Sequence, residues 1–409
     1  MLRINAFEAI RPRPDLAEQV ASVPYDVVNR DEAREFAEGN PHSFLRVVRS
    51  DLELPDDVDP YSDAVYEKAA ANFNRMLDEG VLVRDRKPGL YLYRQAAGPY
   101  EQVGVVACCH VDDYHQDIIK KHEKTRKAKE DDRTRHVLTI NANSGPVFLT
   151  YRDRPAVEES MEQDMAGSPL FNFTAPDGVQ HTGWAVENPE AYLEAFKDVP
   201  AAYVADGHHR AASAARAGKE RQKHNPNHTG DEEYNWFLAV LFPAGKLNIL
   251  AYNRVVRDLA GQSPDDVLKK LSEAGTLSET DQPEPDRAGV FCIYLGGRWH
   301  RLELDPASID RDDPIAGLDV ALVEERILRP ILKIDDARTD ERIDFVGGIR
   351  GTGELEKRVD SGESAIAISM HPTSIEQLLA VSDAGLIMPP KSTWFEPKLR
   401  SGLFIHSLD

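Results

Sequence analysis

The residues best suited to chemistry lie together in one short stretch, from Ala202 to Ala212. An apolar run ends there in Asp206, and Gly207, two histidines and Arg210 follow at once, before an alanine-rich segment. The pattern predicts a strand that leads directly into a helix, with the polar side chains gathered at the junction. Unpaired N–H groups at the start of a helix favour an anion, and a glycine lets a phosphate approach the backbone closely.

The side chains of this junction suit a site for phosphate and metal. Arg210 can bind two phosphate oxygens at once, His208 and His209 can add donors, and Asp206 can hold a divalent cation. A structural interpretation stays open, in which Asp206 only caps the helix and Arg210 is only a surface charge. We expect the helix to end at Gly218, because glycine is common just past the last helical turn. Close packing of this helix on a sheet is expected from its small residues, Ala211, Ala212, Ala214 and Ala215.

A second candidate is the strongly basic run from Lys120 to Arg135, which we expect on a long polar helix from Gln116 to Asn141. Two interpretations stay open. The run is either a solvated helix face with ion pairs between neighbouring turns, or a cationic wall for a polyphosphate with Glu123 as a base or metal ligand. The pair His122-Glu123 does not begin the HExxH motif of zinc proteases, because residue 126 is arginine.

A third candidate lies between Met388 and Gly402, where aromatic residues and prolines occur together with basic residues. Chain ends that are polar usually fray, so this composition predicts a tail that docks onto the body of the protein. The cations of the tail are equally consistent with an anion site and with incidental surface charge. These cations are Lys391, Lys398 and Arg400.

The bulk properties of the chain limit its partners. With 409 residues it is long enough for two or three domains, and its formal net charge is −21. Such a charge repels nucleic acid and anionic lipid, so neither is expected as a partner, and no apolar run reaches the roughly 18 residues of a membrane span. The three cysteines, Cys108, Cys109 and Cys292, form no disulfide pattern, which fits a cytoplasmic location.

The apolar spacing predicts mixed helices and strands with a boundary near residue 250, which separates region 1–250 from region 251–409. A hairpin is expected around Gly98-Pro99, and another around Gly296-Gly297. The other main elements expected are helices at 61–80, 265–274, 320–329 and 374–384, and strands at 146–151, 201–205, 237–242 and 365–369.

The motif at residues 206–210 resembles the phosphate-binding motif of the ParB/sulfiredoxin-like superfamily. Nearly end to end, the chain resembles the bacterial family DUF1015. The resemblance implies an α+β fold, with a ParB/sulfiredoxin-like mixed-sheet core in a nucleotide-binding catalytic region 1–250 and a C-terminal α+β region 251–409. The shared motifs appear here as Val23-Pro24-Tyr25-Asp26-Val27, Lys121-His122-Glu123-Lys124-Thr125, Ala205-Asp206-Gly207-His208-His209-Arg210, Asn253-Arg254-Val255-Val256 and the run from Met388 to Lys398.

The free-serine kinases of that superfamily carry a similar Asp-Gly-His-x-Arg motif. The resemblance therefore implies that this protein uses ATP or ADP, with Mg²⁺, to phosphorylate the hydroxyl of a free small amino acid, above all L-serine. The catalytic glutamate of these kinases lies near the N-terminus, and Glu8 and Glu123 are the two candidates. The alternative is a nucleotide-binding and hydrolysing switch that acts through protein partners. A sulfiredoxin-like reductase is not expected, because residue 208 is histidine.

The kinase hypothesis gives each candidate residue a role. Asp206 binds Mg²⁺ or assists the attacking hydroxyl, and Glu123 accepts its proton. Asp26 holds the amine of the amino acid. A homodimer is left open by the sequence. The phosphates are held by Gly207, His208, His209 and Arg210, the charge on the transferred group is neutralised by Lys121 or Lys124, and the substrate carboxylate is held by Lys391, Lys398 or Arg400.

Overall fold

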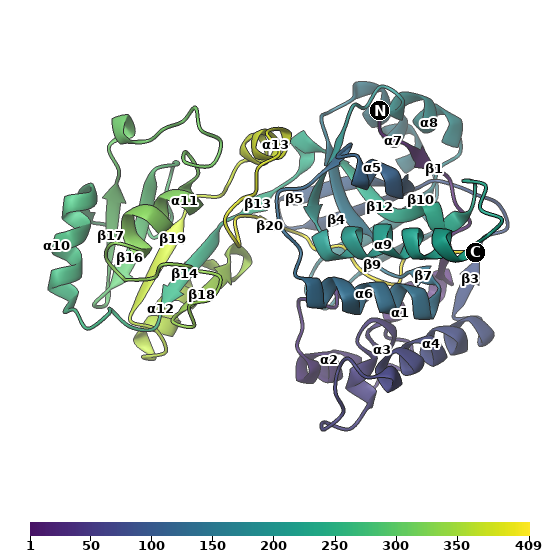
Figure 1. Cartoon of the computed structure of the whole chain (residues 1–409), viewed down its shortest axis with the longest axis horizontal. Helices are drawn as coiled ribbons and strands as arrows, with labels where there is room; N and C mark the ends of the chain where they lie inside the picture. The colour runs from purple at the N-terminus through teal and green to yellow at the C-terminus, as the bar shows by residue number, and fades with distance from the viewer. The chain divides into compact units, whose positions relative to one another are not determined.

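The structure is a computed structural model that describes residues 1–409 (Figure 1). The chain forms two units, Met1–Leu247 with Pro397–Asp409, and Asn248–Glu396. Each unit combines helices with a sheet of at least six strands, so the predicted α+β class is confirmed. The domain boundary expected after residue 250 stays a prediction. The two units differ from it in that the last segment, Pro397–Asp409, belongs with the N-terminal part of the chain.

The first unit is built on a nine-stranded mixed sheet. Two of its strand pairs, β6 with β11 and β8 with β12, are parallel, and the other pairs are antiparallel. The order across the sheet is β6 (Ile119–Lys120), β11 (Ala202–Asp206), β8 (Val147–Tyr151), β12 (Trp236–Pro243), β5 (Tyr100–His110), β4 (Tyr91–Ala97), β10 (Gln180–Ala185) and β9 (Phe171–Thr174), with β1 (Ile4–Asn5) paired to β5.

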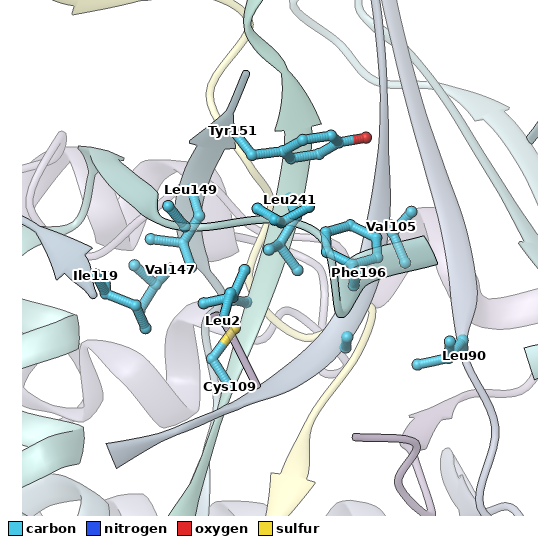
Figure 2. Packing of buried hydrophobic residues seen from close by; sticks show 14 of the residues in the cluster. Leu2, Leu90, Val105, Cys109, Ile119, Val147, Leu149, Tyr151, Phe196 and Leu241 are labelled. Atoms are coloured by element: carbon cyan, nitrogen blue, oxygen red, sulfur yellow. The ribbon is translucent and has the colours of Figure 1, made fainter. Parts of the chain in front are cut away.

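A large apolar core lies between this sheet and the helices that cover it. Because successive strand residues point to opposite faces, Val105 and Cys109 of β5 enter the same cluster, together with Leu149 of β8 and Leu241 of β12 (Figure 2). Phe196 completes this packing from a helix. Helices α7 (Pro155–Met165), α8 (Pro189–Phe196) and α9 (His208–His224) contribute side chains to the core.

Helix α9 confirms the predicted close packing but not the predicted end. Its alanines, Ala211 and Ala215 among them, are buried in the core. The expectation that the helix ends at Gly218 is wrong, because α9 continues to His224. A Cβ atom at residue 218 would lie 2.4 Å from the carbonyl oxygen of Tyr234, so the glycine serves this close backbone approach rather than a helix end.

The long helix expected from Gln116 to Asn141 is also wrong in its first half. Ile119 and Lys120 form the edge strand β6, residues 121–126 form a loop, and only Lys127–Ile140 form a helix, α6. Ile119 is buried and pairs with Ala202 of β11. The charged run that follows carries no apolar period from which a helix start could be located.

A second core of the first unit lies among short helices from the N-terminal part of the chain, against α6 (Figure 1). Only the end of the tail predicted from the sequence, from Pro397 on, belongs to this unit, where Ser401 bridges to Ser22. Beyond that tail, Ile405 bridges to Ile10, and strand β21 (His406–Ser407) pairs with β7 (Ala142–Asn143). The remaining elements of this unit are β2 (Ile10–Pro12), β3 (Leu82–Arg84), α1 (Ala17–Val20), α2 (Arg30–Ala37), α3 (Leu45–Val48), α4 (Asp63–Asp78) and α5 (Val111–His115).

The second unit has a six-stranded antiparallel sheet whose core includes Val255, Cys292 and Leu355. Ser263 caps its first helix through a reciprocal capping box with Asp266. No helix of the chain combines the length and the apolar character that crossing a membrane requires. The elements of this unit are β13 (Ile249–Leu250), β14 (Tyr252–Val256), β15 (Thr276–Glu279), β16 (Val290–Leu295), β17 (Arg298–Glu303), β18 (Ile343–Gly347), β19 (Ile366–Met370), β20 (Trp394–Phe395), α10 (Pro264–Ala274), α11 (Asp319–Val323), α12 (Gly351–Asp360) and α13 (Ile375–Asp383).

Candidate functional site

The strand–helix junction predicted from the sequence is present. Asp206 is the last residue of β11, and α9 begins at His208. Gly207 between them has φ of +88°, a backbone conformation that favours glycine. A Cβ atom at this position would also lie 2.9 Å from Nε of Arg210. Two features therefore require glycine here: the positive φ of the turn and the close approach of the Arg210 guanidinium.

Asp206 lies between two cations. Its Oδ2 is 3.3 Å from Nζ of Lys398 and 3.6 Å from Nη2 of Arg210. Burial alone would raise the pKa of Asp206, but the attraction of Lys398 and then of Arg210 outweighs burial and holds this pKa well below its ordinary value. Asp206 is consequently a carboxylate at neutral pH, and the three side chains form a compact charged group at the start of α9.

Arg210 is not the surface charge of the structural interpretation. Its side chain is only 11% exposed, and Nη1 donates to the carbonyl oxygen of Pro146 at 2.5 Å. Nε is buried without a hydrogen-bond partner. Part of the guanidinium is thus fixed by the backbone before β8, and the rest lies beside Asp206 and Gly207.

Two buried histidines stand next to this charged group. The rings of His122 and His208 meet edge to face at 4.5 Å, and Nδ1 of His208 lies 3.9 Å from Oε2 of Glu123. Burial lowers the pKa of His122 to about 4 and lowers the pKa of His208 well below its ordinary value. Both rings are therefore neutral at pH 7. Nδ1 of His122 and Nε2 of His208 are buried without hydrogen-bond partners.

His209 connects the junction to the loop before α6. Its Nε2 accepts a hydrogen bond from the backbone N–H of Arg126 at 3.1 Å. Burial lowers the pKa of His209, and the nearby carboxylate of Asp26 acts in the opposite direction. The motifs around residues 25, 123 and 206 are distant in sequence, and the structure brings them to one place.

Three other predicted residues are placed less favourably for phosphate. Nζ of Lys121 donates to the carbonyl oxygen of Tyr114 at 2.9 Å and pairs with Asp117 at 2.5 Å, so its charge is already used at the end of α5. Lys124 is exposed on the loop. Glu8 is exposed before β2 and makes no hydrogen bond or ion pair with the junction.

The three cations proposed to bind the substrate carboxylate lie in three different places. Lys398 reaches Asp206, as described above. Arg400 is buried and pairs instead with Asp177, while its Nε approaches Nε2 of His181 at 3.3 Å. Lys391 belongs to the second unit, where its carbonyl oxygen accepts a hydrogen bond from Arg254 at 3.2 Å.

Two glutamines that the sequence analysis missed hold the tail in place. Nε2 of Gln95 donates to the carbonyl oxygen of Lys398 at 2.8 Å, and Nε2 of Gln102 donates to that of Pro397 at 3.0 Å. Both side chains are buried in strands β4 and β5. A glutamine at an inward-facing strand position could have indicated this role, because a buried amide requires hydrogen-bond partners.

The junction does not fit a resident metal ion. No group of three or more histidine, cysteine, aspartate or glutamate side chains is arranged to hold one. Asp206 is a single carboxylate whose two neighbours, Lys398 and Arg210, are cations. Magnesium usually needs one or two carboxylates together with water and substrate phosphates. We therefore derive no step from a metal held by the protein alone.

The mixed sheet and the junction define the class of this protein. It is an α+β protein in which residues from three distant motifs meet at a charged strand–helix junction. Over residues 4–321 the chain matches the family described as "Protein of unknown function (DUF1015)". The chain belongs to that family, and the resemblance seen in the sequence is confirmed. No curated protein matches the chain.

Several solved structures are distantly similar. A free serine kinase in complex with AMP has a TM-score of 0.36 and 11% identity, over 75% of this chain and 91% of that one. SbnI with a C-terminal truncation, from Staphylococcus aureus, has a TM-score of 0.41 and 11% identity, over 74% and 87%. A conserved hypothetical protein from Pyrococcus furiosus has a TM-score of 0.35 and 12% identity, over 74% and 94%. At these scores the similarity carries no argument about activity.

Proposed function

We propose that this protein transfers a phosphoryl group from a nucleotide, ATP or ADP, to the hydroxyl of a free small amino acid, with L-serine as the acceptor. One observation carries the proposal. Asp206, Lys398 and Arg210 form a charged group at the start of α9, and Glu123 lies beside the same helix, 3.9 Å from His208. The choice of serine and of the ParB/sulfiredoxin-like superfamily follows the sequence resemblance.

Phosphoryl transfer depends on positioning and on neutralisation of charge rather than on covalent chemistry by the protein. Lys398 and Arg210 supply positive charge, and the N–H groups in the first turn of α9, which no side chain caps, are available to a phosphate at the same end. An oxygen–phosphorus bond forms to the serine hydroxyl while the bond to the leaving nucleotide phosphate breaks. The nucleotide leaves with one phosphate fewer.

The hydroxyl proton must pass to a base. Asp206 is a weak base, because its two cations hold its pKa far down. Glu123 is half exposed and stands on the loop beside neutral His208, so it is the better acceptor. A positioned base contributes a factor of about 10²–10⁴ in rate. In this proposal Asp206 organises the cations, and Glu123 takes the proton.

Magnesium enters this proposal with the nucleotide, as part of the substrate, because the junction has no metal site of its own. The proposed assay therefore contains Mg²⁺ together with ATP or ADP. Each free amino acid is added in turn, and the mass of the product is measured. Phosphoserine that forms only with serine and nucleotide supports the proposal. No phosphorylated amino acid with either nucleotide contradicts it, and nucleotide hydrolysis without transfer favours the switch hypothesis.

The two candidate glutamates form a matched pair in this assay. We expect Glu123→Gln to lower kcat by about 10²–10⁴-fold, because the amide cannot accept the proton. Glu8→Gln changes an exposed residue without a contact to the junction and is expected to retain the wild-type rate. The reverse result, a large loss for Glu8→Gln alone, would move the base to the N-terminal segment.

A further inference from the structure

Arg210 of the junction also lines a small cavity of ≈ 40 Å³. Its walls come from the loop before α2, from helix α6, from the turn before β8 and from the docked tail. All of these lie in the first unit. The polar residues that matter for the argument are Tyr25, Arg133, Ser144, Arg210 and Ser401.

The charge of this cavity is the reverse of that of the whole chain. Two arginines line it, Arg133 and Arg210, and no aspartate or glutamate does. The chain as a whole carries a net charge of −21. A partly enclosed wall with two guanidinium groups favours an anion far more than the open acidic surface does.

Several donors around the cavity have no partner within the chain. Arg133 uses Nε for Asp132 at 2.9 Å and Nη1 for the carbonyl oxygen of Val48 at 3.3 Å, which leaves Nη2 without a hydrogen bond. The hydroxyl groups of Tyr25, Ser144 and Ser401 also make no hydrogen bond inside the protein, although all three residues are buried. Burial raises the pKa of Tyr25, so its hydroxyl stays protonated and can donate.

The guanidinium of Arg133 is also held rigidly. It stacks over the ring of Tyr25 at 4.2 Å and pairs with Asp132 on its own helix. A fixed, planar guanidinium is suited to two parallel hydrogen bonds with a carboxylate or a phosphate. A cavity of ≈ 40 Å³ has room for roughly three water molecules, which matches one such group and excludes a nucleoside.

We propose that this cavity binds one small oxyanion, either the carboxylate of the amino-acid acceptor or a phosphate group of the nucleotide. The donors are Arg133, Arg210 and the hydroxyls of Tyr25, Ser144 and Ser401. The choice of these two sources rests on the proposed function, whereas the oxyanion site itself rests on the cavity. The kinase hypothesis gave no role to Arg133, Ser144 or Ser401.

The test is equilibrium binding, measured by calorimetry on the full chain with four probes: inorganic phosphate, AMP, L-serine and L-serinamide. We expect Arg133→Gln to weaken binding of the oxyanion probe by about tenfold or more, because a charged hydrogen-bond donor is lost. Arg135→Gln is the matched control. Arg135 lies on the same helix and also stacks on a tyrosine, Tyr66 at 4.2 Å, but it is more exposed than Arg133 and does not line the cavity.

The probes separate the two sources. Binding of serine but not of serinamide, with loss in Arg133→Gln, identifies the acceptor carboxylate. Binding of phosphate and AMP with the same loss, and no effect on serine, identifies a nucleotide phosphate. Two milder variants, Tyr25→Phe and Ser401→Ala, each remove one hydroxyl and keep the arginines. Each is expected to weaken binding of the same probe several-fold. These two variants test the inference if Arg133→Gln fails to fold.

Probes that bind equally well to wild type, Arg133→Gln and Tyr25→Phe overturn the inference, and so does wild-type protein that binds none of the four. The outcome for the kinase is read separately. Oxyanion binding that depends on Arg133 without any phosphoryl transfer would contradict the proposed function and leave the cavity site standing. Phosphoserine formation with unchanged probe binding in Arg133→Gln would contradict only the cavity site.

Discussion

Two cations of the same tail, Lys398 and Arg400, are only two residues apart but lie in very different surroundings. Lys398 pairs with Asp206 at the open start of a helix, where Arg210 adds a second positive charge. Arg400 is 6% exposed and is enclosed by Asp177 and His181. Both regions contain a cation, a carboxylate and a histidine, so residue type alone does not separate them.

The two regions differ in how many of their polar groups have hydrogen-bond partners within the chain. Around Arg400 the hydrogen bonds form a closed network, in which His181 accepts from Arg400 at Nε2 and bonds Tyr93 through Nδ1 at 2.7 Å. Around Asp206 the histidine His208 keeps a buried nitrogen without a partner, and the helix N–H groups stay available. A closed network holds a tail in place, whereas an open one leaves donors for a ligand.

The sharpest way to test this comparison is to remove the charge of Lys398. We expect Lys398→Met to lower the rate of phosphoryl transfer by about 10²-fold or more, because a cation that stabilises the transferred group is lost. The free energy of unfolding should also fall, by about 1–2 kcal/mol, because partly buried Asp206 loses one of its two cations and keeps Arg210. Transfer kinetics and urea unfolding on the same preparation measure both values. An unchanged rate would remove Lys398 from the site.

The corresponding change at the closed network should act mainly on stability. We expect Arg400→Met to lower the free energy of unfolding by about 2 kcal/mol or more, because His181 and the tail lose a buried partner. The loss is limited by Asp177, whose side chain is half exposed and can return to water. Unfolding by urea, followed by circular dichroism, measures the effect. Wild-type stability in this variant would contradict the structural role assigned to Arg400.

The pH dependence of stability adds a third comparison, since each region contains a buried neutral histidine. Burial lowers the pKa of His122 to about 4, and burial and then Arg400 lower the pKa of His181 to about 3, against an ordinary value near 6.5. The folded state therefore binds fewer protons than the unfolded state below pH 6.5. The stabilisation is complete above that pH and is lost as the pH falls toward these lower values.

For His122 alone, the expected loss in the free energy of unfolding is up to about 2 kcal/mol between pH 6.5 and pH 5. Urea unfolding at pH 7 and at pH 5 measures the total loss. His122→Gln and His181→Gln should each make the pH dependence shallower. Equal stability of the wild-type protein at the two pH values would show that these histidines are not buried in the neutral form.

The smallest expected effect concerns Gln95, which holds the tail through the backbone of Lys398. Gln95→Leu replaces the amide by an apolar side chain of similar size. It removes the hydrogen bond to the carbonyl oxygen of Lys398 and the one that Gln95 accepts from Gln102. We expect kcat to fall several-fold with little change in KM, because the position of Lys398 becomes less well defined. Equal changes in both parameters, or a change in stability alone, would indicate a purely structural glutamine.

Local features of the fold could be predicted from the sequence, and long-range ones could not. The hairpin around Gly98 and the capped helix after Ser263 follow from turn and cap chemistry within a few residues, and both are present. Gly218 was misjudged, because the reason for that glycine is the backbone of Tyr234. The loop at 121–126 was predicted as helix, because a charged run without apolar periodicity is equally compatible with a helix and with a loop.

The site shows the same limit. The junction at Asp206 could be predicted, because a strand, a glycine and a helix follow one another in the sequence. The partner of Asp206 could not, since Lys391, Lys398 and Arg400 are all basic residues of one tail and only the fold separates them. Arg133 lies in a basic run in which residue type does not separate it from Arg135. The fold separates them, because Arg133 is buried in the cavity wall and Arg135 is exposed.

The most direct test of the central claim compares Asp206→Asn with Asp112→Asn in the transfer assay with serine, Mg²⁺ and ATP or ADP. Asp112 of α5 pairs with Lys219 of α9 at 2.8 Å, outside the junction. The Asp112→Asn variant therefore controls for the loss of one ion pair on α9. We predict phosphoserine from the wild type and from Asp112→Asn, and almost none from folded Asp206→Asn. Full activity of Asp206→Asn would contradict the account.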